Sequence, residues 1–485
     1  MDPTNFLNAL PTTQTSESRA QAKLLIKAAE ANIACIESQM KDLERLRDQE
    51  RGIITRLWMA IAPVHQLPPE LLAEIFLIVH EDVYPFSRKG RVQKVQALSQ
   101  VCAFWRSVAH TTPRLWTESL SVKVDETPTA DYVSFVKEWL ERSALIQIPV
   151  QLKIPGKNVE MGPLMDAVAT TAHRWKRAIF DIPSLSIFCS IPPDSLKSLK
   201  RLSLRSADAK HHKDTQPFVT AGRLRRVSLT THRTSGLLMP WSQLTHMNVI
   251  DTSPQECLDA LVQCTAIVSA KFETMAWQDF PDMSQRPITT LARLKKLCVE
   301  FCTPGGFIVP FFVCLALPAL ATLTLELDID HTWSSAEFTQ FQLRSPNIED
   351  LTIERSPMES DDLLAVLQHA PLLVSLHMEC CMYCFDNSFL DGLQYSPAQA
   401  VHLAPKLEFL SWTYAGVGFD EDALDAMIRS RWWTDEQLLA FPSPPRVARL
   451  ASVDILCDDD ADNVSLEFMN KMEEYRSQGL EISVS

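Results

Sequence analysis

The side chains best suited to metal chemistry lie in one short cysteine-rich segment. Cys381 and Cys384 form a Cys-x-x-Cys pair directly after Cys380, and His377 precedes them in the same segment. Thiolates and imidazole are preferred zinc ligands, but a structural zinc site needs four of them. The sequence holds no second Cys-x-x-Cys or His-x-x-x-His pair at a matching spacing. We therefore interpret these cysteines as buried thiols of a reduced protein, and we expect no metal and no other cofactor.

Motifs of catalytic chemistry are absent from the sequence. It contains no HExxH metalloprotease motif, no GxSxG nucleophile elbow and no Walker-type phosphate loop, and its 12 glycines in 485 residues disfavour a glycine-rich nucleotide fold. His211 and His212 lie in a polar segment that is typical of a solvated loop. Asp458, Asp459 and Asp460 lack the spaced ligands of a cation site. We predict that the protein is not an enzyme.

The composition is that of an acidic globular protein. Apolar residues make up 46% of the chain and the formal net charge is −14, which excludes a disordered chain and disfavours a general nucleic-acid binder. The first 20 residues lack a signal-peptide pattern. The longest apolar run, residues 307–317, contains a proline and is shorter than the ~20 residues of a membrane helix. We expect a cytoplasmic or nuclear protein with neither a membrane nor a nucleic-acid partner.

The elements that would position these residues come from a repeating leucine pattern. Each copy has apolar residues at positions one, four and six, as in Leu199, Leu202 and Leu204. Eight clear copies begin at Leu199, Leu224, Leu244, Ile267, Leu294, Leu320, Ile348 and Leu373, and weaker ones begin at Trp175, Leu407 and Leu450. The clear copies start 20 to 28 residues apart, within the range of about 20–29 for leucine-rich repeats. They lack the asparagine that many such repeats place after the strand, which indicates an irregular variety.

Helical segments are expected between the repeated strands. Residues 254–263 and 361–369 have a capping or acidic start and apolar residues three and four apart, and the apolar run 307–317 is interpreted as a buried helix. Repeated strand–helix units bury their leucines by stacking. The fold class is therefore α/β: residues 161–485 should form a curved, mostly parallel sheet with helices on its convex side.

Charged residues recur at fixed positions on the face of the predicted sheet that points away from the leucines. Position seven carries glutamate in five successive copies, namely Glu273, Glu300, Glu326, Glu354 and Glu379. Position three carries arginine in early copies, namely Arg177, Arg201 and Arg226. Like charges on neighbouring strands destabilise a sheet, so we hypothesise that these rows bind a protein substrate and that the glutamates receive its basic segment. Inheritance from one ancestral repeat, or neutralisation by loop groups, would also explain the glutamates.

The net charge is distributed unevenly along the chain. Residues 1–170 are nearly neutral, at −1, while residues 171–240 carry 13 basic and 4 acidic side chains, a net +9. Residues 241–485 carry 14 basic and 36 acidic side chains, a net −22. We expect an array that is basic at its start and acidic beyond.

Residues 17–60 should form one long helix. Apolar residues recur at alternate steps of four and three from Ala22 to Leu57, interrupted by Arg47 and Glu50, and charged residues occupy the other faces. This spacing is a coiled-coil seam. Two outcomes stay open: self-association as a short coiled coil, or packing back as a helical hairpin on the next domain.

A short apolar module follows this helix. It comprises the segments LPPELLAEIF (67–76), VCAFWRSVA (101–109) and PRLW (113–116), and a polar, loop-like stretch separates the first two. Together these segments resemble the F-box, and more closely the F-box proteins of a large fungal group that have a preceding helix. In this chain Leu67, Pro68, Leu71, Ile75, Val101 and Trp105 match positions that face the adaptor or shape the domain. The link at residues 84–94 departs from the family because it is longer and more basic.

The resemblance implies a partner and a function. F-boxes are three-helix modules that bind the Skp adaptor and so join a cullin-based (SCF-type) ubiquitin ligase. The chain would be its non-catalytic substrate receptor; the alternative is an interaction scaffold without ligase function. The expected organisation is a disordered start and a coiled-coil helix in 1–60, the F-box in 61–120, a helix (131–143) and first strand (146–154) in 121–160, and the repeat array in 161–485.

Overall fold

The computed structural model describes most of the chain. The described residues are 16–81, 88–117, 120–123, 127–154, 161–192, 194–206, 217–235, 237–283, 286–381, 383–415, 420–457 and 465–484. His211, His212 and the aspartates 458–460 lie outside them. The chain divides into two compact units, Met1–Thr112 and Pro113–Ser485.

The first unit begins with the long helix α2 (Ser16–Ile61), as predicted. Its seam side chains are exposed to solvent: Ile33 and Ile36 are each 55% exposed and Leu43 is 65% exposed. The helix therefore does not fold back as a hairpin, and that alternative is wrong. The apolar seam is an open surface in the single chain.

Three helices complete this unit after the short turn η1 (Pro63–Gln66). They are α3 (Pro69–Glu81), α4 (Arg88–Gln100) and α5 (Ala103–Thr111). Pro69 occupies the first helical position, where its missing N–H costs nothing, and the side chain of Cys102 caps α5 by accepting from the Trp105 N–H. The helix α4 begins inside the stretch that the sequence indicated as a loop, and residues 82–87 lie outside the described ranges.

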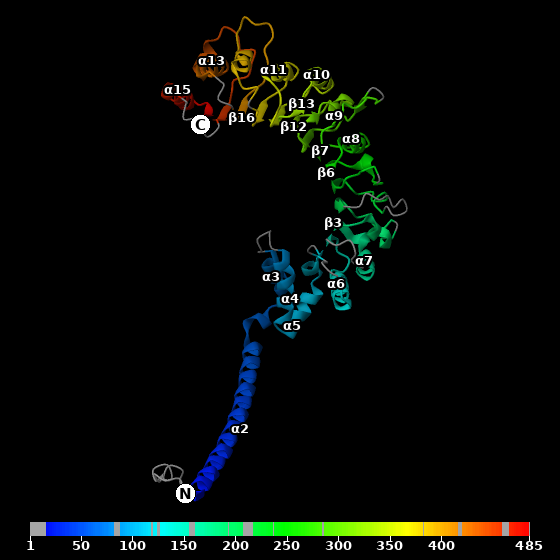
Figure 1. Cartoon of the computed structure of the whole chain (residues 1–485), viewed down its shortest axis with the longest axis vertical. Helices are drawn as coiled ribbons and strands as arrows, with labels where there is room; N and C mark the ends of the chain where they lie inside the picture. The colour runs from blue at the N-terminus through cyan, green and yellow to red at the C-terminus, as the bar shows by residue number, and fades with distance from the viewer. Residues whose placement is uncertain are drawn as a thin grey trace. The chain divides into compact units, whose positions relative to one another are not determined.

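The second unit is built on one parallel sheet of 14 strands. Along the sheet the strands are β1 (Leu120–Lys123), β2 (Ile148–Lys153), β3 (Trp175–Ile182), β4 (Arg201–Ser206), β5 (Arg226–Thr230), β6 (His246–Thr252), β7 (Ser269–Thr274), β9 (Lys296–Phe301), β12 (Thr322–Glu326), β14 (Asp350–Glu354), β15 (Ser375–Glu379), β16 (Phe409–Ala415), β17 (Ser452–Cys457) and β18 (Glu481–Val484). Figure 1 shows these strands following the inner side of a curved array, with the helices on its outer side. The array is an irregular leucine-rich-repeat solenoid.

Helices and short bridging strands connect the strands of the sheet. The α-helices are α6 (Ala130–Arg142), α7 (Gly162–Ala169), α8 (Pro254–Val262), α9 (Pro310–Val313), α10 (Ser335–Arg344), α11 (Ser360–Gln368), α12 (Asn387–Leu393), α13 (Glu421–Arg431), α14 (Asp435–Ala440) and α15 (Leu466–Ser477). Single 3-10 turns are η2 (Pro113–Trp116), η3 (Ala172–Arg174), η4 (Leu185–Ser190) and η5 (Trp241–Gln243), and short strands pair as β10 (Gly306–Phe307) with β13 (His331–Thr332) and β11 (Leu315–Ala316) with β8 (Thr289–Thr290). Within the described ranges, every helix is too short or too polar to cross a membrane.

The repeated leucines stack in register to form the core. Leu297, Leu323 and Leu351 are direct partners on β9, β12 and β14, and each is at most 1% exposed. Each strand alone could bury only one face, so the neighbouring copy supplies the other half of the core. The predicted positions one, four and six are confirmed as the buried side of the array.

The segment 307–317 differs from its prediction as one buried helix. Its apolar side chains are buried, with Phe311 and Phe312 both 0% exposed, but the helix α9 spans only four residues. Pro310 is the first residue of α9, where its missing N–H costs nothing, and Gly305 and Gly306 adopt positive φ of 70° and 89° before it. The short strands β10 and β11 lie on either side of α9, so the chain forms a single helical turn between them.

Two arginines bind backbone carbonyls in the loops between repeats, and one of them is buried. Arg431, 1% exposed at the end of α13, donates to the carbonyls of Leu393 at 2.6 Å, Leu403 at 2.5 Å and Ala404 at 3.0 Å. Arg344 donates likewise to the carbonyls of residues 313 and 315. These side chains supply donors to loop backbone, a need that regular repeats meet with asparagine.

The PRLW segment belongs to the second unit. It forms η2, and its Trp116 packs edge-on against Trp139 of α6 at 4.7 Å between ring centroids. The guanidinium of Arg142 lies 4.8 Å from the Trp116 ring centre. The three segments that resemble the F-box are therefore shared between two compact units.

Candidate protein-binding surfaces

Five glutamates form a continuous row across the sheet. Each is the direct register partner of the next, in the order Glu273, Glu300, Glu326, Glu354 and Glu379 on β7, β9, β12, β14 and β15. They lie on the face opposite the leucines. Because neighbouring strands are about 4.8 Å apart, the carboxylates are close enough to repel one another. The predicted alignment is confirmed; its binding role stays a prediction. We call these five residues the glutamate row.

Crowding changes the ionisation of the middle of the glutamate row. Burial raises the pKa of Glu326, and the neighbouring Glu300 raises it further. Burial also raises the pKa of Glu354, with added repulsion from Glu326 and Glu379. Both carboxyl groups would therefore gain from a cationic neighbour.

One lysine on the same face of the sheet partly neutralises the row. Lys271 Nζ lies 3.6 Å from Glu300 Oε2 and 3.9 Å from Glu326 Oε1. It occupies position five of the repeat copy that begins at Ile267, between the row's position seven and the basic row's position three. Arg355 also lies near the row and opposes the rise in the pKa of Glu326 and Glu354, so these two cations neutralise only part of the five carboxylates.

Two cysteines border the glutamate row. Cys302 Sγ lies 3.8 Å from Glu300 Oε1, and Glu273, Glu300 and Cys302 place potential ligand atoms within 4.8 Å of one another. Burial and the nearby carboxylates raise the pKa of Cys302 to about 11, and burial is the main cause that raises the pKa of Cys298 to about 11. Both thiols are therefore protonated at neutral pH in the free protein.

The three arginines of position three form a second, basic row. Arg177, Arg201 and Arg226 are exposed register partners on β3, β4 and β5, and His246 on β6 continues the row. Burial lowers the pKa of His246, and Arg226 and Arg201 lower it further, so this imidazole is neutral at pH 7. A shallow groove of about 230 Å³ runs over the three arginine-bearing strands. The same sheet face thus carries a basic part followed by an acidic part.

The cysteine-rich segment is split between the two faces of the sheet. Cys381 and Cys384 are buried, and Cys381 Sγ donates to the carbonyl of Ile353 at 3.4 Å. His377 lies on the exposed face and pairs with Ser375 Oγ at 2.8 Å. The structure therefore does not bring His377 to the buried thiols, in keeping with the interpretation of the cysteines as core residues.

The residues expected to meet an adaptor divide into a surface set and a packing set. Leu71, Ile75 and Val101 are 55, 41 and 50% exposed. Pro68 is also exposed, Leu67 is half-buried, and half-buried Trp105 packs on buried Phe76 at 4.9 Å between ring centroids.

One further apolar residue extends the surface set. Ile78, 61% exposed, lies one turn beyond Ile75 on the same side of α3. Its spacing of three and seven residues from Ile75 and Leu71 could have identified it from the sequence.

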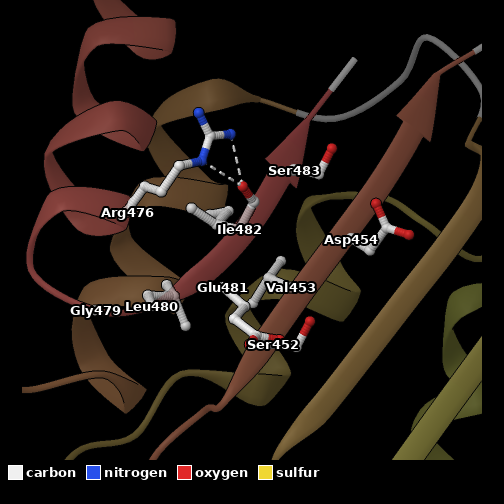
Figure 2. A pocket seen from close by; sticks show the side chains of 9 residues that line it. All are labelled: Ser452, Val453, Asp454, Arg476, Gly479, Leu480, Glu481, Ile482 and Ser483. Atoms are coloured by element: carbon white, nitrogen blue, oxygen red, sulfur yellow. Dashed lines mark hydrogen bonds between the residues drawn. The ribbon is translucent and has the colours of Figure 1, made fainter.

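The far end of the array has a hollow at the last strand. Figure 2 shows Arg476 of α15 reaching over β18 to the carbonyl of Ile482, to which its Nε and Nη2 donate at 3.1 and 2.7 Å. Glu481 donates its N–H toward β17, so the next carbonyl faces the open sheet edge. This hollow, about 610 Å³, lies at the capped edge of the sheet.

Comparison with known proteins adds little beyond this geometry. No family model matches the chain, and no curated protein is significantly similar to it. Among solved structures, a leucine-rich-repeat protein of Leptospira interrogans superposes with a TM-score of 0.36 at 12% identity, covering 80% of this chain and 94% of that one. A TM-score this low carries no argument, so the repeat class rests on the strand register described above.

Proposed function

We propose that the protein is the substrate-recognition subunit of an SCF-type cullin ubiquitin ligase. The observation that carries this proposal is the exposed apolar side of α3, formed by Leu71, Ile75 and Ile78, in a module whose sequence resembles the F-box. An apolar row that stays in water is typical of a docking surface. The Skp adaptor would cover it, and the ligase core would supply all the catalysis.

The adaptor contact is tested by pull-down with purified Skp adaptor. The full chain should retain the adaptor, Leu71→Asp with Ile75→Asp should release it, and Trp105→Ala should weaken it by loosening the contact with Phe76. Glu70→Gln on the same helix is the matched control and should bind normally. If the unmodified chain does not retain the adaptor, the ligase assignment fails and a non-ligase interaction scaffold becomes the better description.

The repeat array would bind a protein substrate through the glutamate row. Burial and, after it, repulsion between carboxylates raise the pKa of Glu326 and Glu354, and a basic segment that is laid across β9, β12 and β14 would relieve the repulsion. Receptor binding would raise the effective concentration of the substrate near the ubiquitin-carrying enzyme. The basic row at the start of the array offers a second contact of opposite charge.

The substrate surface is tested by affinity purification of the full chain and two triple variants. Glu300→Gln with Glu326→Gln and Glu354→Gln should lose basic partners that wild type retains at low salt. A control with the same charge change, on exposed glutamates outside the row, consists of Glu436→Gln, Glu474→Gln and Glu481→Gln. An unchanged set of retained proteins in the first variant would refute the role of the glutamate row.

A further inference from the structure

The seam of α2 is long enough to pair with a second helix. The helix has 46 residues, or about 69 Å at 1.5 Å per residue. In heptad terms the a positions are Ile26, Ile33, Met40, Arg47, Ile54 and Ile61, and the d positions are Ala22, Ala29, Ile36, Leu43, Glu50 and Leu57. The large apolar side chains of the seam are all exposed to solvent, by 51 to 66%. The seam thus presents apolar surface on both sides of Arg47 and Glu50.

Two charged residues in the seam distinguish the possible orientations of a partner helix. In a parallel pair of identical helices, each a or d residue faces its own copy. Arg47 would then face Arg47 and Glu50 would face Glu50, in adjacent layers of the interface. In an antiparallel pair, a residues face d residues, and a twofold axis between residues 48 and 49 places Arg47 opposite the partner's Glu50 on both sides.

The same axis matches the flanking side chains as well. It pairs Leu43 with Ile54, Met40 with Leu57, and Ile36 with Ile61, so that each remaining layer is apolar. Beside the seam it brings Glu44 near Arg51 and Leu46 near Ile53. One register thus pairs both charged layers with opposite charges and keeps the apolar residues together.

We propose that two copies of this chain associate through α2 as an antiparallel coiled coil centred between residues 48 and 49. The paired segment is residues 36–61, about 39 Å of helix. Ile26 and Ile33 lie outside it, in the part of the seam where Ala22 and Ala29 at d would add little packing. Arg47 is free to turn to the partner because its present ion pair with Asp48, 3.1 Å long, is exposed and weak.

Association is tested on the full chain by sedimentation velocity at micromolar concentration. The unmodified protein should sediment as a dimer, and Leu43→Glu with Ile54→Glu should sediment as a monomer. Ser38→Glu with Gln49→Glu adds the same charge on the outer side of the helix and should remain dimeric. Circular dichroism confirms that each variant is folded. A monomeric unmodified chain overturns the proposal.

Orientation is tested by disulfide trapping in a Cys35→Ser background. Met40→Cys with Leu57→Cys should give an intermolecular disulfide between positions 40 and 57, identified by mass spectrometry of the tryptic digest of the dimer. Met40→Cys alone should give no 40–40 disulfide, because the two copies lie about 25 Å apart along the axis. A 40–40 disulfide would instead show a parallel pair and would overturn the proposed register. Binding of the Skp adaptor is measured separately. If the chain does not bind the adaptor, the tests of the α2 dimer remain valid.

Discussion

Glu354 illustrates how a single residue of the array can lower its folding stability through charge repulsion, which a cationic partner would relieve. Its carboxylate lies between two register partners of the same charge, Glu326 and Glu379. Each like-charged pair on neighbouring strands costs roughly 0.2–1 kcal/mol. The array therefore keeps charged residues that lower its folding stability at positions where neutral side chains would fit.

The Glu354→Gln variant should be more stable than wild type at neutral pH. A carboxyl group whose pKa is raised by folding adds stability below its unfolded pKa, and this is lost as pH rises through the folded pKa. The gain should therefore be about 0.5–1 kcal/mol at pH 7.5 and should shrink toward pH 4.5. Thermal unfolding at several pH values measures it. Glu481→Gln, exposed and outside the row, is the control and should not raise the stability at pH 7.5. An equal gain at all pH values in Glu354→Gln would contradict the mechanism.

At the scale of elements, the last strand shows how a side chain caps part of the open edge of the array. The strand β18 has no further strand beside it. Open edges recruit other strands and promote aggregation. The guanidinium of Arg476 occupies the outward carbonyl of Ile482 and links the edge to α15.

Arg476→Ala should loosen β18 while the rest of the array stays folded. Loss of a hydrogen bond from a charged donor costs roughly 1.5–3 kcal/mol, so the amides of β18 should exchange with solvent about tenfold faster or more. Hydrogen–deuterium exchange with mass spectrometry measures this. Lys406→Ala, an exposed control, should leave exchange in β18 unchanged. Equal protection in Arg476→Ala would show that the cap does not stabilise the edge.

The sequence predicts the repeated strands well because their signal is local. Leucines at positions one, four and six must face one side of any strand, so Leu323 and its equivalents identify both the strands and the core. The glutamate row follows from the same period. Lys271, in contrast, reaches Glu326 across two strand boundaries, and a one-dimensional pattern does not contain that distance.

Contacts between distant segments explain the other differences. Trp116 ends a motif that resembles the F-box, yet it packs on Trp139 in the second unit. The strand β18 lacks the leucine pattern of the repeats and is paired only because β17 offers an edge. The single turn α9 replaces a longer helix because the residues on either side of it pair as short strands, β10 with β13 and β11 with β8.

At the scale of the whole molecule, charge divides the array into two parts. Residues 171–240 carry a net +9 and residues 241–485 a net −22, and the sheet places them on successive strands. Fields of this size steer charged partners before contact, and salt screens them over about 10 Å at 0.1 M. A basic partner should therefore associate faster at low salt.

The two compact units should unfold separately. The fragment 113–485 keeps the core of the array and η2, so we expect it to fold alone and to show the same calorimetric transition as the array in the full chain. A fragment 121–485 lacks Trp116 and uncovers Trp139, and it should melt at a lower temperature. If fragment 113–485 fails to fold, the array depends on the first unit and this division is wrong.

The guanidinium of Arg431 has a consequence for how this array tolerates change. It holds the carbonyl at the end of α12 and the carbonyls of Leu403 and Ala404, so both ends of the intervening loop are attached to one side chain. The closure entropy of a loop grows only slowly with its length. Extra sequence, such as an epitope tag placed near residue 398, should therefore be accommodated without displacing β16, which makes this loop a natural point for evolutionary insertion.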